Sequence, residues 1–145
     1  PRAEDIARMK IVAAECYEPL WRSAGGAIRI SSFYRSPALN SKVGGSKTSQ
    51  HMLGAAIDIV ATGKMTNAKL LQLARALPSY DQLISEFGPN EENPAWVHVS
   101  FISKEKNRRQ YLRIGKNCSK LLVIIRQLSS SEKRVLVRPH KFPSI

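Results

Sequence analysis

Apolar residues recur at helical spacing in two stretches of the chain. Residues 3–22 carry them every three or four positions with charges between, which predicts an amphipathic helix that Pro19 kinks or ends. Residues 67–77 repeat leucine at the same spacing, so we expect a second helix, capped by Thr66 and ended by Pro78. The apolar stripe expected on the first helix consists of Ile6, Met9, Ala13 and Cys16.

Shorter stretches have the character of strands. Residues 27–33 alternate apolar and polar side chains, as a half-buried strand does, and residues 55–61 form a short β-branched apolar run typical of a buried strand. Residues 81–87 and 95–101 are predicted as two further strands separated by a turn-rich segment. Residues 36–48 are rich in Ser, Gly, Asn and Pro, and we expect a loop there. Together these elements predict an α+β fold, in which two helices pack on a small, mostly antiparallel sheet.

Length and composition limit the class of protein. At 145 residues the chain fits one compact domain, and it has no apolar run long enough to span a membrane. Its formal charge of +12 favours anionic polymers, which include nucleic acid, acidic lipid and bacterial cell wall. Only two cysteines occur, Cys16 and Cys118, so no disulfide framework is expected.

The character of the chain changes after about residue 104, where it becomes strongly basic. We therefore predict a main domain over residues 1–117. The remaining residues, 118–145, are expected to form an added β-hairpin, an extra helix or a tail ordered by a partner. No signal peptide is visible, but the chain begins at Pro1 rather than Met, so an exported form with an upstream segment stays open.

Two of the three histidines lie in the most strongly patterned part of the chain. Strand alternation puts His98 on the face opposite Val97 and Val99, and it puts Asp58 opposite its two isoleucine neighbours. A buried carboxylate needs a partner, because leaving it unpaired costs several kcal/mol. With His51, these residues would supply two imidazoles and one carboxylate, a common ligand set for catalytic zinc. From the residues alone, a core histidine and an ion-paired aspartate remain an alternative.

The stretch SQHMLGAAID at residues 49–58 resembles the SxHxxGxAxD signature of the zinc D-alanyl-D-alanine carboxypeptidase family. This family includes phage endolysins and murein endopeptidases, and it shares its metal centre with the hedgehog signalling domain. Residues 33–51 resemble the entry into that signature, and residues 81–101 resemble the second metal-binding block. The resemblance spans about residues 5–115 and rests on three motifs in consistent order.

The resemblance implies that His51, Asp58 and His98 bind one Zn²⁺ per chain. It also implies a general base near the last ligand, and Glu86 stands where the family pattern places it. Arg35 resembles the arginine that polarises the scissile carbonyl and stabilises the oxyanion, a role suited to a guanidinium. An ordinary ion pair between Arg35 and an aspartate is the alternative.

One departure from the pattern leaves the choice of base open. The lengthened connection before Trp96 could bring Glu91 and Glu92 within reach of the same site, so Glu92 is a rival. We favour Glu86 because a strand holds a catalytic side chain more tightly than a loop does. Ser49, Gln50 and Trp96 are expected to contact the substrate or line its pocket.

The sequence therefore predicts a zinc metallopeptidase that hydrolyses amide bonds in peptidoglycan stem peptides or cross-links, as a carboxypeptidase or an endopeptidase. The alternative is a metal-bearing cell-wall binding module with little or no hydrolytic activity. Nucleic acid is not expected as a partner, because the chain has no recognition motif or aromatic stacking array. A bacterial or phage-encoded protein acting on the cell wall would fit these expectations, and the oligomeric state stays open.

Overall fold

The computed structural model describes residues 1–117, 120–127 and 135–136. The predicted division at residue 117 stays a prediction. Parts of the predicted extension, at residues 118–119, 128–134 and 137–145, lie outside the described residues.

The N-terminal segment is one continuous helical rod with a wider turn in its middle. It comprises α1 (Ala3–Val12), a π-helical turn (Ala13–Tyr17) and α2 (Glu18–Ser23). Pro19 lies in the first turn of α2 and does not end the helix. The π-helical turn before it already departs from the regular α-helical hydrogen-bond pattern, so the proline, which has no N–H, is tolerated there. The predicted apolar stripe is partly wrong, since Ile6 is 44% exposed while Asp5 and Val12 are buried.

Seven strands form one sheet within the described residues, in the order β1-β2-β4-β3-β5-β6-β7. All neighbouring pairs are antiparallel except β3 and β5, which run parallel. This arrangement confirms the predicted α+β class with a mostly antiparallel sheet. The strands are β1 (Ile28–Ser32), β2 (Ala56–Ala61), β3 (Gln82–Glu86), β4 (Trp96–Ser100), β5 (Gln110–Asn117), β6 (Lys120–Gln127) and β7 (Val135–Leu136).

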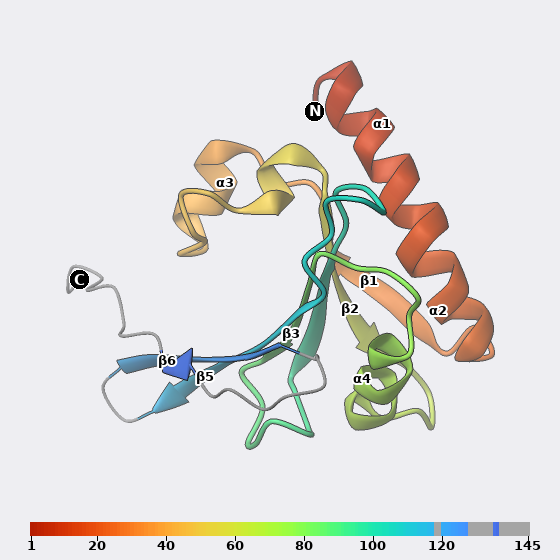
Figure 1. Ribbon diagram of the computed structural model, residues 1–145, viewed down its shortest axis with the longest axis vertical. Helices are drawn as coiled ribbons and strands as arrows, with labels where there is room; N and C mark the ends of the chain where they lie inside the picture. The colour runs from red at the N-terminus through yellow and green to blue at the C-terminus, as the bar shows by residue number, and fades with distance from the viewer. Residues whose placement is uncertain (118–119, 128–134, 137–145) are drawn as a thin grey trace.

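Helices α1, α2 and α4 (Asn67–Arg75) cover one face of the sheet (Figure 1). The Thr66 hydroxyl caps α4 by accepting a hydrogen bond from the Lys69 amide at 3.1 Å, as predicted. The main core lies between these helices and the sheet, where each element contributes its apolar face. It includes Val12, Cys16, Leu20, Ile57, Ile59, Leu70, Leu71, Leu83, Val97 and Val99. No helix in the described part of the chain has the length and apolar character needed to cross a membrane.

The opposite face of the sheet carries α3 (Pro37–Lys42) and a single 3-10 turn, η2 (Gln50–Leu53) (Figure 1). The expectation of a loop over residues 36–48 is therefore wrong for its first half. Ser36 caps α3 by accepting a hydrogen bond from the Leu39 amide, and Pro37 occupies the first helical position. Serine followed by proline is a helix-start signal, and it outweighs the loop-like composition that follows.

Candidate metal centre

Two of the candidate ligands face each other across neighbouring strands. Asp58 on β2 is directly paired with His98 on β4 in the antiparallel register. Their chain neighbours Ile57, Val97 and Val99 point into the core, as the alternation predicted. Both ligand side chains therefore lie on the other face of the sheet, close enough to share one ion.

His51 reaches the same point from η2. Its Nδ1 lies 2.6 Å from the carbonyl oxygen of Phe33, so this nitrogen carries the proton and donates. The Arg35 amide in turn donates to the carbonyl oxygen of His51 at 3.1 Å. Gly54 closes the turn with a φ of +66°, a conformation that favours glycine. Segment 33–35 and this glycine thus fix the ring so that Nε2 points at the two strand residues.

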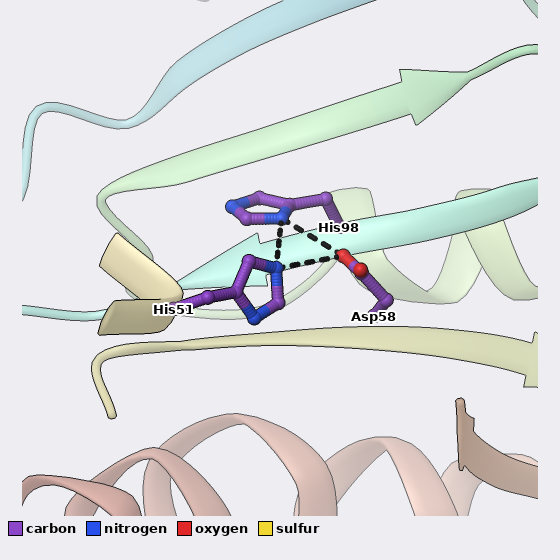
Figure 2. A group of neighbouring side chains, drawn as sticks. All are labelled: His51, Asp58 and His98. Atoms are coloured by element: carbon purple, nitrogen blue, oxygen red, sulfur yellow. Dashed lines mark hydrogen bonds and ion pairs between the residues drawn. The ribbon is translucent and has the colours of Figure 1, made fainter. Parts of the chain in front are cut away.

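The three ligand atoms form a tight, buried triangle (Figure 2). His51 Nε2 lies 3.1 Å from Asp58 Oδ1 and 3.2 Å from His98 Nδ1. His98 Nδ1 lies 2.9 Å from the same Asp58 oxygen. Two nitrogens and one oxygen therefore converge on one point between η2, β2 and β4.

This donor set fits a zinc ion. Tetrahedral ligands about 2.0–2.1 Å from Zn²⁺ are about 3.3–3.4 Å apart, close to the separations in this triangle. In the neutral tautomer that donates Nδ1–H to Phe33, Nε2 of His51 has the lone pair needed to bind a metal ion. The hydrogen bond from His51 Nδ1 to a backbone carbonyl is also the usual outer support of a metal-bound imidazole.

The electrostatics of the triangle also suit a metal. Burial lowers the pKa of His98, and this outweighs the opposing effect of Asp58, so the imidazole is neutral at pH 7. Burial alone would raise the pKa of Asp58, but the hydrogen bonds with both imidazoles dominate and hold it well below its usual value. Neutral imidazoles and an ionised carboxylate are the forms that bind Zn²⁺.

Arg35 lies beside the triangle and is ion-paired with it. Its Nη2 donates to Asp58 Oδ2, the carboxylate oxygen that faces away from the histidines, and its Nε donates to Ser32 Oγ at 2.8 Å. A register irregularity in β1 between Ile30 and Ser32 lies next to this contact. The ion-pair alternative is therefore present in the structure. Arg35 still lines the cavity next to the ligands, so its pairing with Asp58 does not remove it from the site.

Glu86, at the end of β3, lies close to the ligands. Its Oε1 lies 3.9 Å from His98 Nδ1, and its side chain lines the same cavity. Burial, together with the nearby Asp58 carboxylate, raises the pKa of Glu86 to about 8. Arg35 and Trp96 oppose that shift.

Glu92, the alternative candidate for the general base, lies outside the cavity lining. Glu92 is 62% exposed and pairs with Arg75 of α4 at 3.3 Å. Glu91 also approaches Arg75, at 3.8 Å, and its carbonyl oxygen accepts a hydrogen bond from Ser85. The lengthened connection thus directs both side chains toward α4, and the structure brings Glu86 but not Glu92 to the cavity.

The cavity next to the triangle has a volume of about 1040 Å³. The predicted substrate contacts Ser49, Gln50 and Trp96 all line it, together with residues 43–46 and 48 and parts of β3 and β5. The side-chain nitrogen of Gln50, however, donates to Asp81 Oδ2 at 2.9 Å. Gln50 is therefore held by the protein itself and forms a fixed part of the cavity wall.

Asp81 is the residue that sequence reasoning missed. It is fully buried before β3, and its carboxylate accepts hydrogen bonds from Gln50 and from the backbone and side chain of Arg108. Burial opposes its ionised form, but the hydrogen bonds from Arg108 leave the pKa of Asp81 lowered. A carboxylate at the start of an apolar strand was the available signal, since such a group needs partners. Asp81 joins η2, which carries His51, to the start of β5.

The family model described as Peptidase M15 matches residues 4–100, which include the triangle, Arg35 and Glu86. No curated protein matches the chain. Because the match covers more than half of the sequence, the chain belongs to the peptidase M15 family of zinc D-alanyl-D-alanine carboxypeptidases and related metallopeptidases.

Proposed function

We propose that this protein is a zinc-dependent peptidase that hydrolyses amide bonds in peptidoglycan stem peptides or their cross-links, acting on the bacterial cell wall. The observation that carries the proposal is the triangle of His51, Asp58 and His98, which opens onto a cavity large enough for a peptide. Membership of the peptidase family supports amide hydrolysis as the reaction. The formal charge of +12 supports residence near anionic wall polymers.

The residues around the triangle have distinct roles in this proposal. When bound, zinc supplies a Lewis acid that polarises a carbonyl and acidifies water. The positive charge of a bound ion would favour the ionised form of Glu86, whose pKa is otherwise raised. The Glu86 carboxylate, which lies beside the ligands in the cavity, then takes a proton from the attacking water and passes it to the leaving amine. Its placement on a strand, next to Trp96 on β4, holds the carboxyl group in position.

Arg35 serves the site in two ways. Its Nη2 holds Asp58 Oδ2, which leaves the other carboxylate oxygen aimed at the histidines. The guanidinium has further N–H groups, and they can donate to the substrate oxygen as negative charge develops on it. An arginine so anchored needs little reorganisation during the reaction.

The test compares Glu86→Gln with Glu92→Gln, measuring zinc content and release of soluble products from purified peptidoglycan. Glu86→Gln should keep one zinc per chain and lose at least about 100-fold in rate, the usual contribution of a general base. Glu92→Gln should retain wild-type activity, because that side chain pairs with Arg75 at the surface. Amino-acid analysis of the products then separates carboxypeptidase from endopeptidase cleavage. Zinc binding without cleavage by the wild type would contradict the proposal and favour a binding module.

A further inference from the structure

Strand β5 contributes to the cavity although it lies beyond residues 4–100, which the family model matches. It pairs with β3 in parallel, with Gln82 opposite Gln110 and Glu86 opposite Ile114. The Phe87 amide also donates to the carbonyl oxygen of Ile114 at 2.7 Å. Strand β5 is thus firmly attached to the strand that carries the proposed base.

The register places apolar side chains in a row with a metal ligand. His98 is directly paired with Ile84 on β3, and Ile84 is paired with Leu112 on β5. Neighbouring strands lie about 4.8 Å apart, so these two side chains stand about 5 and 10 Å from the strand of His98. One residue of an extended peptide spans about 3.3 Å. A substrate whose scissile bond lies at the triangle would therefore place its nearest flanking residues over Ile84 and Leu112.

The orientation of β5 follows from its other face. Tyr111 is buried beneath the guanidinium of Arg75 from α4, with 4.4 Å between the guanidinium carbon and the ring centroid. Because successive side chains of a strand point to opposite faces, Leu112 and Ile114 point away from α4. Both line the cavity, as does Ile84.

We propose that Ile84, Leu112 and Ile114 form a specificity subsite for an aliphatic side chain of the substrate, next to the scissile bond. This inference rests on the proposed peptidase function and adds the substrate class that the cavity selects. The three side chains are apolar, and Leu112 is only 7% exposed. A charged substrate side chain placed against them would lose its hydration without gaining a polar partner from these residues. An alanine or larger aliphatic residue would instead bury apolar surface against them.

The experiment uses the zinc-loaded protein and variants of a stem peptide that it cleaves. The residue flanking the scissile bond, on each side in turn, is replaced by Ala, Leu, Lys or Glu, and kcat/KM is measured for each peptide. On one side of the bond, the wild type should prefer aliphatic over charged residues by about tenfold or more. Ile114→Asn should reduce that ratio severalfold, and a ratio between peptides cancels any common loss of activity. Ile102→Asn is the matched control, because Ile102 is 47% exposed and outside the cavity lining.

A second variant addresses size rather than polarity. Leu112→Ala enlarges the subsite, so it should raise the Leu-to-Ala ratio of kcat/KM above that of the wild type. Cleavage by the wild type without side-chain preference on either side would overturn the subsite and leave the peptidase function intact. A preference that neither variant alters would also overturn it. Absence of cleavage of any stem peptide would contradict the proposed function, and the subsite with it.

Discussion

Gly54 lies close to the backbone of α1 next to the metal centre, and replacing it with alanine tests how the site is held. Gly54 ends the turn that carries His51 and has a φ of +66°. A Cβ at this position would lie 2.6 Å from the backbone oxygen of Asp5 and 2.8 Å from Met9 Cγ, both on α1. Either α1 or the turn must move to admit the methyl group.

The expected cost has two parts. A left-handed conformation costs a residue with a Cβ about 1–2 kcal/mol. Overpacking against a fixed backbone atom adds about 1–3 kcal/mol. Gly54→Ala should therefore lower the free energy of unfolding by about 2–5 kcal/mol. Because the Gly54 amide donates to the carbonyl oxygen of His51, displacement of the turn should also weaken zinc binding.

Gly63→Ala provides the matched control. Gly63 has a φ of +61° but nothing within 4 Å of the position that its Cβ would take. It should therefore cost only the conformational part, about 1–2 kcal/mol, and leave zinc affinity unchanged. Urea unfolding of the zinc-free proteins and zinc titration with a competing chelator measure the two effects. Equal destabilisation by the two substitutions would refute the argument that the approach of α1 fixes the turn.

Two further predictions concern acid and metal. Because the pKa of Asp81 is lowered in the folded protein, its contribution to stability is present above the ordinary carboxyl range and is lost as pH falls through the lowered value. Below about pH 4, the free energy of unfolding of Asp81→Asn should therefore fall less steeply with decreasing pH than that of the wild type. Urea unfolding at a series of pH values measures this, and equal pH dependence of the two proteins would contradict the prediction. Zinc at about 100 times its Kd should stabilise the wild type by about 2.7 kcal/mol, seen as a raised Tm that chelation reverses. His51→Ala should lose this shift, and its persistence would count against the triangle as the binding site.

The elements that the sequence predicted well are those with strong local signals. Alternation around Asp58 and His98 was enough to place both on one face of the sheet, because one face of each strand is fully apolar. Thr66 was recognised as a cap because its hydroxyl acts within the first turn of its own helix. The ligand set came from the spacing of the motif and from the resemblance that it carries. These predictions needed no knowledge of distant contacts.

The features that the sequence could not reveal depend on contacts between distant segments. The parallel pairing of β3 with β5 joins residues almost thirty positions apart, and no local pattern specifies it. The position of Glu92 depends on Arg75 of α4, so the longer connection alone could not show where that carboxylate points. Asp5 is buried and its carboxylate pairs with Arg2 and Arg8, whereas Ile6 is exposed, and the apolar pattern alone could not show that a charged residue takes the inner position.

The direct pairing of Asp58 with His98 makes zinc a reporter of strand register. A slip of one residue in either strand would turn its ligand into the core and bring an apolar neighbour to the cavity. An ion that requires both side chains on the same face can bind only when β2 and β4 are aligned as they are here. Zinc would therefore select the correctly paired sheet during folding, and mispaired forms would be those that fail to retain the metal.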